Sequence, residues 1–332
     1  MMPPRGAALA AALPITYDDV RAARERLRPH LAPTALRDYP QLDALVGHGV
    51  RVWMKHENHQ PTQSFKIRNG LNTVLGRSAE QRAHGVIGAS TGNHGLGVAY
   101  AGRLTGTPVA ICVPVGNNPA KNAAIRALGA ELIEVGASYD ETVRACGELA
   151  QQRGMALVHS TNDPLVVAGA ATMTDEILDQ QPELDALVIA LGGGSQAVGA
   201  LTVALARKPE LKVYAVGAAG APAQYDSWTK GTRLEHQPVQ TFAEGIATGS
   251  AYALTFDALR EGLSDFIKVT DDEMYTAIRD LLGVTRNLAE GAGAAGFAGL
   301  RKLAPRLEGK RVGVVMCGGN LSDKDLRVAV CG

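Results

Sequence analysis

The chain has 332 residues, which is more than one compact core usually holds, so we expect two domains. Lys plus Arg and Asp plus Glu each number 33, so the net charge is zero, and nothing in the charge balance favours nucleic acid or a membrane surface as a partner. Four cysteines without metal-ligand spacing are too few for a disulfide framework, which favours a reducing cytoplasm.

Residues 1–16, MMPPRGAALAAALPIT, lack the leucine-rich segment of a signal peptide, and we expect a frayed arm there. Short apolar runs then alternate with helix-like segments. The runs predict strands at 50–54, 85–90, 108–115, 131–135, 156–160, 186–191, 212–218, 266–270 and 311–317. The segments between them predict helices that include 69–84, 95–106, 118–130, 139–153 and 164–181.

This alternation predicts an α/β fold with mainly parallel sheets. Such sheets bind ligands at the carboxyl ends of their strands, so the residues that follow each strand are the places to examine. No Gly/Pro/Ser-rich linker separates two halves of the chain, and we therefore expect the two domains to be interleaved.

Lys66 lies between Phe65 and Ile67 in QPTQSFKIRNG (60–70), where a turn leads into a helix. Burial and the positive end of a helix both disfavour an ammonium ion. A neutral amine is a nucleophile that forms a Schiff base with an aldehyde. The ordinary alternative is a lysine on the helix surface with its amine in water.

Three further motifs follow predicted strands. ASTGNHG (89–95) offers hydroxyl, amide and N–H groups that suit a carboxylate, or it is an ordinary helix cap. LGGGSQAVG (191–199) leads into a helix and predicts a phosphate cradle, although a tight turn explains it as well; it matches neither the dinucleotide-binding nor the P-loop pattern.

MCGGN (316–320) places Cys317 at a strand end, either as a core thiol or as a small polar group in a site. A nucleophilic cysteine would need a histidine base; His94 and His159 are candidates, but nothing in the sequence places either beside it. Taken together, the four motifs indicate a ligand with an aldehyde and a phosphate and a partner with a carboxylate. Pyridoxal phosphate and an amino acid satisfy every feature.

These four motifs, in this order, resemble those of fold type II pyridoxal-phosphate enzymes (tryptophan synthase β-like), most closely the threonine/serine dehydratase and serine racemase group. The resemblance implies two interleaved three-layer αβα domains with mainly parallel sheets. Residues 1–84 plus 161–332 would form a large cofactor-binding domain. Residues 85–160 would form a small mobile domain that closes over the substrate.

The resemblance also implies roles for individual residues. Lys66 would hold pyridoxal 5'-phosphate through a Schiff base, Phe65 would pack on its ring, Asn93 would bond the ring hydroxyl, and Cys317 would lie at the pyridine nitrogen. The predicted phosphate cradle is Gly192, Gly193, Gly194 and Ser195. The predicted grip on the substrate carboxylate is Ser90, Thr91, Gly92, Asn93 and His94.

The sequence departs from the family pattern at several positions. Gln63 and Asn69 stand where glycines are usual, Ser195 replaces the fourth glycine of the phosphate loop, and Gln196 replaces an apolar residue. Ala219 stands where related enzymes carry a metal-binding Glu, so we predict no metal site. QAVG, AGAAT (168–172) and ATGSAYALTF (247–256) indicate a substrate other than plain threonine, such as hydroxyaspartate, phenylserine or a hydroxyectoine breakdown product.

The resulting hypothesis is an ammonia-lyase of the threonine/serine dehydratase kind, in which Lys66 is the general base for β-elimination and the products are a 2-oxo acid and ammonia. One alternative is a serine-type racemase that uses Thr91 as its second acid/base. Another is a catalytically inactive binding protein. The resemblance further implies a homodimer acting on a small amino acid. The cysteine content and the charge balance predict a cytoplasmic protein with neither nucleic acid nor a membrane as a partner.

Overall fold

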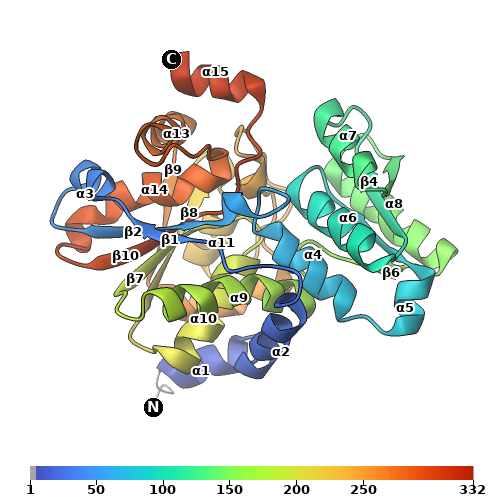
Figure 1. The fold of residues 1–332 in the computed structure, drawn as a ribbon, viewed down its shortest axis with the longest axis horizontal. Coiled ribbons are helices and arrows are strands. Elements are labelled where there is room, and N and C mark those ends of the chain that lie inside the picture. Colours follow the sequence, from blue (N-terminus) through green and yellow to red (C-terminus); the bar gives the residue numbers. More distant parts are fainter. Residues whose placement is uncertain (1–4, 332) are drawn as a thin grey trace.

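A computed structural model describes residues 5–331 (Figure 1). The larger of its two sheets has six strands in the order β1-β2-β10-β7-β8-β9. Neighbouring strands are parallel, except that β1 runs antiparallel to β2. The strands are β1 Leu36–Asp38, β2 Arg51–His56, β7 Ala186–Ala190, β8 Lys212–Ala218, β9 Asp265–Val269 and β10 Arg311–Met316.

Helices cover both faces of this sheet, which explains why its central strands β7 and β10 are apolar apart from Arg311. One face carries α3 Pro40–Val46, α13 Asp271–Thr285 and α14 Gly291–Leu303. The other carries α2 Tyr17–Leu27, α9 Pro164–Gln180 and α10 Ser195–Arg207. At the periphery lie α1 Arg5–Ala12, α11 Ala223–Lys230, α12 Ala253–Gly262 and α15 Asp323–Cys331.

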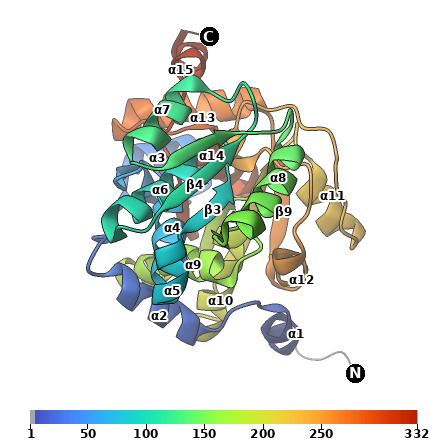
Figure 2. The ribbon, with the colours of Figure 1, turned by 90° about the vertical axis from the view of Figure 1, so that its right-hand side faces the viewer.

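The second sheet has four parallel strands in the order β5-β4-β3-β6 and is seen from its side of the molecule in Figure 2. Its strands are β3 Val86–Ala89, β4 Val109–Val113, β5 Glu131–Glu134 and β6 Ala156–Leu157. Its helices are α5 Ala79–His84, α6 Asn93–Thr105, α7 Pro119–Ala127 and α8 Tyr139–Arg153. The α/β class with mainly parallel sheets is therefore confirmed.

Helix α4 (Lys66–Leu75) lies between the two sheets and packs against α6 on one side and α9 on the other. Glycines allow these close approaches. A Cβ atom at Gly97 would overlap the carbonyl oxygen of Lys66, and one at Gly70 would overlap the backbone of Gly97. The contact therefore fixes the first turn of α4 directly against the helix that follows the ASTGNHG motif.

A buried network of four charged side chains anchors the same helix. The Arg68 guanidinium donates to both carboxylate oxygens of Glu57 at 2.8 Å and to both of Glu176 at 2.7 Å. Lys55 donates to Glu176 at 3.0 Å. Each charge has an opposite partner, which is what makes burial of the group tolerable.

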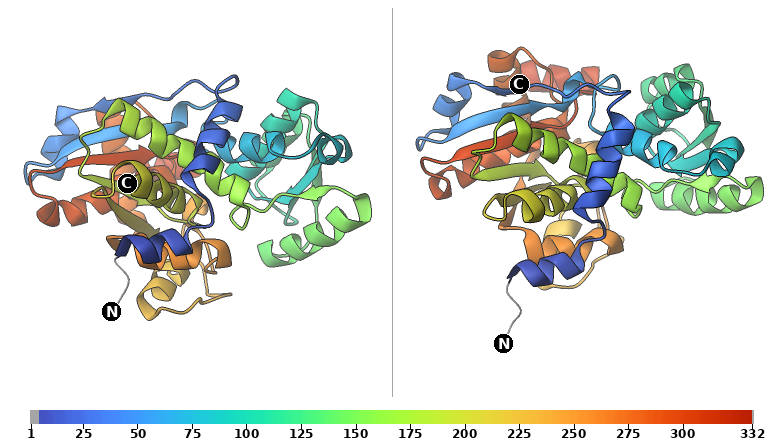
Figure 3. Two further views of the ribbon diagram at one scale, coloured as in Figure 1. Left: turned by 90° about the horizontal axis from the view of Figure 1, so that it is seen from below. Right: turned by 60° about the horizontal axis from the view of Figure 1, so that its bottom comes forward.

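Two predictions about elements were wrong. The helix predicted at 69–84 is two helices, since α4 ends at Leu75 and Ser78 caps the start of α5 through a capping box with Gln81. The frayed arm is instead α1, which packs against α12 with Leu9 at the core (Figure 3); residues 1–4 lie outside the described part of the chain.

Strand β1 and helices α2 and α3 were not predicted. None of the helices within residues 5–331 is both long and apolar enough to cross a lipid bilayer.

Candidate active site

A cavity of about 650 Å³ brings the four sequence motifs together. Lys66 lines it from α4, residues 90–94 follow β3, residues 192–196 follow β7, and Cys317 follows β10. Three of these segments come directly after parallel strands, so the cavity lies where the strand ends of both sheets converge. All the residues predicted to form the site line this one cavity.

Lys66 is the first residue of α4, and its side chain faces the cavity. Its Nζ lies 5.0 Å from the centroid of the Phe65 ring. Burial lowers the pKa of the Lys66 ammonium to about 8, while the nearby Cys317 acts weakly in the opposite direction. A sizeable fraction of this amine is therefore neutral near physiological pH and able to act as a nucleophile or base.

The backbone conformation at Gln63 explains why the resembled family usually has glycine at this position in the turn before Lys66. Gln63 has a φ of 55°, in the left-handed region that favours glycine. The turn is held by the N–H of Gly319, which donates to the Gln63 carbonyl at 2.9 Å, and the N–H of Phe65 donates to the Cys317 carbonyl at 3.0 Å. The Lys66 segment is thus tied to the MCGGN segment.

The ASTGNHG segment is shaped by the Ser90 hydroxyl, which accepts hydrogen bonds from the N–H groups of Gly92 at 3.3 Å and Gly95 at 2.8 Å. His94 is 5% exposed, and neither of its ring nitrogens has a hydrogen-bond partner within residues 5–331. Burial lowers the pKa of His94 to about 3, so its imidazole is neutral. Ser90 therefore sets the loop conformation, and His94 is left with unused hydrogen-bonding capacity.

Asn93 is held from two sides. Its Nδ2 donates to Glu290 Oε1 at 2.6 Å, and its Oδ1 accepts from Asn320 Nδ2 at 2.7 Å. Burial raises the pKa of Glu290 to about 7. Glu290 was not predicted as a site residue. The only signal for it in the sequence is its place as an isolated acid directly before the Gly/Ala-rich segment GAGAAGFAG.

The glycine loop presents N–H groups to the cavity because its carbonyls are engaged elsewhere. The Gly192 carbonyl accepts from Gln224 Nε2 at 3.0 Å, that of Gly193 from Thr255 Oγ1 at 2.8 Å, and that of Gly194 from the N–H of Val198 at 2.9 Å. The N–H groups of Gly193 and Gly194 find no acceptor among residues 5–331. With the start of α10, they form a site suited to an anion.

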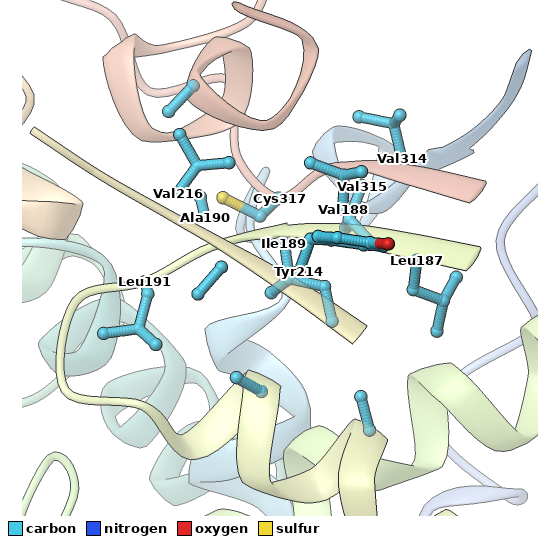
Figure 4. Packing of buried hydrophobic residues seen from close by; sticks show 14 of the residues in the cluster. Leu187, Val188, Ile189, Ala190, Leu191, Tyr214, Val216, Val314, Val315 and Cys317 are labelled. Carbon is cyan, nitrogen blue, oxygen red and sulfur yellow. The ribbon is translucent and has the colours of Figure 1, made fainter. Parts of the chain in front are cut away.

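Cys317 is 4% exposed and belongs to the same buried cluster as Ala190 and Val216 (Figure 4). Burial, together with the charge of Glu290, raises the pKa of its thiol, so the sulfur stays protonated. No imidazole hydrogen-bonds to this sulfur within the described part of the chain, which argues against a nucleophilic role. Cys317 is a neutral, weakly polar group at the cavity wall.

One ion pair and one histidine–carboxylate hydrogen bond connect α7 and α8 to residues 236–244 at the cavity. Lys121 of α7 contacts Glu244, and Asp140 of α8 accepts from His236 Nδ1 at 2.8 Å. All four side chains line the cavity. No group of three or more His, Cys, Asp or Glu side chains suited to a metal ion occurs within residues 5–331.

The residues present fit pyridoxal phosphate. A partly neutral amine, an anion site of free N–H groups and an unionised thiol line the same cavity. This combination can bind an aldehyde covalently and hold a phosphate, while residues 90–94 remain for a carboxylate.

Comparisons with known proteins agree with this chemistry. A family model described as "Pyridoxal-phosphate dependent enzyme" matches residues 27–318. An L-threonine ammonia-lyase of Thermotoga maritima is 36% identical over 310 residues, which cover 92% of this chain and 76% of the relative.

Two solved structures are also similar. The processed form of threonine deaminase isoform 2 from Solanum lycopersicum has a TM-score of 0.89 at 28% identity, with 97% of this chain and 87% of that chain covered. A pyridoxal 5'-phosphate-dependent aspartate racemase has a TM-score of 0.88 at 30% identity, with 93% and 97% covered.

Proposed function

This chain belongs to the family of pyridoxal-phosphate-dependent enzymes, and from that premise we propose how its residues carry out deamination. It is a pyridoxal-phosphate-dependent ammonia-lyase of the threonine dehydratase kind. Its reaction converts a β-hydroxy amino acid such as threonine to a 2-oxo acid and ammonia. The observation that carries the assignment of roles is the amine of the half-buried Lys66, with its pKa near 8, in the same cavity as the glycine loop.

Lys66 would hold the cofactor aldehyde and, once the substrate amine has replaced it, would remove the Cα proton. Bound pyridoxal phosphate supplies an electron sink for the charge left at Cα. The N–H groups of Gly193, Gly194 and Ser195 would bind its phosphate. Phe65, whose ring lies beside the Lys66 amine, would pack on the cofactor ring.

The other cavity residues would orient the reactants. Residues 90–94 would hold the substrate carboxylate, and Asn93, fixed by Glu290 and Asn320, would hydrogen-bond the ring hydroxyl. Cys317 would face the pyridine nitrogen as a neutral thiol. Such a neutral partner would leave the ring nitrogen without a strong proton donor, so the bound cofactor would supply a weaker electron sink and loss of the β-hydroxyl would be favoured.

Racemisation is the second candidate function, because the Thr91 hydroxyl lines the cavity and a structurally similar protein is an aspartate racemase. A racemase needs a second acid/base on the opposite face of Cα, and Thr91 would have to serve as that group.

We further propose that residues 85–160 form a small domain that closes over the substrate, with 1–84 and 161–332 as the large domain. The four strands of the second sheet fall within residues 86–157, which supports this division. We also propose a cytoplasmic homodimer; the cysteines are all unpaired within residues 5–331, as expected in a reducing compartment. Sedimentation analysis of the purified protein tests the dimer.

The deciding experiment is incubation of the cofactor-loaded protein with L-serine, L-threonine and L-threo-3-hydroxyaspartate in heavy water, followed by proton NMR. A 2-oxo acid with ammonia is expected, and the fastest substrate identifies the side chain that the cavity accepts. Loss of the Cα proton signal with the amino acid retained and its D-enantiomer appearing would instead establish a racemase. Cofactor binding without either reaction would favour a binding protein.

A further inference from the structure

The side-chain amide of Gln196 is buried, and its N–H group has no hydrogen-bond partner in the described part of the chain. It is the second residue of α10, is 4% exposed and lines the cavity. Its Nε2 is sealed from solvent and has no hydrogen-bond partner within residues 5–331. Buried amides are normally paired, because an unpaired one has lost its hydrogen bonds to water without replacement.

The position of Gln196 points to an anion as the missing partner. It directly follows the glycine loop, where the carbonyls of Gly192 and Gly193 are tied back by Gln224 and Thr255 and the N–H groups are free. The segment LGGGSQAVG contains neither Lys nor Arg. The loop itself would therefore bind an anion through uncharged donors alone. One more side-chain donor at the start of α10 strengthens such a site.

We propose that the Gln196 side-chain amide donates a hydrogen bond to the phosphate group of the bound cofactor. This inference rests on the proposed function, since it assumes that pyridoxal phosphate occupies the cavity. It adds a ligand to the predicted cradle of Gly192, Gly193, Gly194 and Ser195. The resembled family carries an apolar residue at this position, so the additional donor is a feature of this chain.

The test compares two cofactor forms that differ only in the phosphate. The apoprotein and its variants are titrated with pyridoxal 5'-phosphate and with pyridoxal, and binding is followed by the visible absorbance of the bound aldehyde. Gln196→Met keeps the size of the side chain and removes the donor. Hydrogen bonds to charged groups are stronger than those between neutral groups. We therefore expect Gln196→Met to weaken pyridoxal phosphate binding by about tenfold to a hundredfold and to leave pyridoxal binding unchanged.

Gln196→Glu is the second variant, and its negative charge should weaken phosphate-form binding further while still sparing pyridoxal. Thr202→Val is the matched control: Thr202 is buried on the same helix, its hydroxyl bonds the Val198 carbonyl at 2.9 Å, and it lies outside the cavity lining. It should leave the ratio of the two affinities as in the unsubstituted protein.

Equal loss of both affinities in Gln196→Met would overturn the inference, because it would mean a general packing role. Unchanged affinity for pyridoxal phosphate would overturn it as well. If the unsubstituted protein bound neither aldehyde, the proposed function itself would fail. The two failures are thus distinguishable.

Discussion

Lys66 owes its lowered pKa to burial rather than to a neighbouring cation, since desolvation is the main cause and the one nearby charge effect opposes it. Lys66 lies in the first turn of α4, where the positive end of the helix dipole also disfavours a positive charge. Its reactivity is therefore set by the packing of the cavity walls around the first turn of α4.

We expect the Lys66 amine of the apoprotein to react with pyridoxal at a rate that rises with pH and has its midpoint near pH 8, because the neutral form becomes populated there rather than near 10.5. Stopped-flow absorbance at a series of pH values measures this rate.

Lys66→Ala should lose the borohydride-reducible visible chromophore altogether; a variant that kept it would show that another lysine carries the cofactor.

Glu290 gives a second pH effect, with a sign opposite to that of most carboxylates. Its pKa is raised from 4.5 to about 7, first by burial and then by the charge of Glu244, while Lys121 and Asn93 act in the opposite direction. Between these two pH values the folded protein keeps the proton and the unfolded chain has released it. The contribution of Glu290 to stability is therefore greatest at low pH and is lost as pH rises through about 7.

Glu290→Gln should remove this dependence. Urea unfolding of the apoprotein at pH 5, 6, 7 and 8 should show that the difference in stability between variant and unsubstituted protein shifts in favour of the variant as pH rises. Glu25→Gln is the control, because that side chain is 65% exposed and is not among the charges that shift the pKa of Glu290. A constant difference across the four pH values would contradict the assignment.

At the scale of elements, the crossing of α4 and α6 joins the two halves of the site. Lys66 begins α4, Asn93 begins α6, and the helices touch through Gly70 and Gly97. The Arg68 network fixes the other side of α4 to α9 and to the segment after β2. The amine and the carboxylate-binding loop are thus held at a defined separation by helix packing.

Gly97→Ala should separate these helices, because its Cβ would overlap the Lys66 carbonyl oxygen. We expect a loss of stability of about 1–3 kcal/mol, as for other overpacked sites, together with weaker cofactor binding. Gly147→Ala in α8 is the matched control, since nothing lies within 4 Å of its Cβ. That change should stabilise the protein by up to about 1 kcal/mol. Thermal unfolding and cofactor titration of both variants measure the contrast.

At the scale of the whole molecule, the helices that flank the second sheet contact the large-sheet part of the chain at the cavity. The Lys121–Glu244 and Asp140–His236 pairs connect α7 and α8 to the segment between α11 and α12. Such partly exposed pairs are worth about 0–1 kcal/mol each. The proposed movement of residues 85–160 would therefore break these pairs at little cost in free energy.

Reversing the charge of one partner, as in Lys121→Glu, should place two like charges together and raise KM by up to about fivefold at low ionic strength. The double variant Lys121→Glu/Glu244→Lys should restore most of the loss. Steady-state kinetics with the substrate identified by NMR measures both. If the double variant were no better than the single one, Lys121 would be contacting the substrate instead of acting through Glu244.

Local patterns in the sequence were sufficient to predict the parallel strands and the segments that line the cavity. Alternating apolar runs predicted the parallel strands, and the segments that follow them contained Lys66, Asn93, the glycine loop and Cys317. These inferences succeed because periodicity reports which side chains are buried, and strand ends in parallel sheets share one edge.

The tertiary structure alone decided the partners of these groups. Glu290 meets Asn93 across 197 positions of the chain, and Arg68 meets Glu176 across 108. Within residues 5–331 the Nε2 of Gln196 has no hydrogen-bond partner, whereas Gln224 and Thr255, from distant helices, bond the loop carbonyls. Side-chain pairing at such separations depends on how helices and sheets pack, and a local pattern carries no information about that geometry.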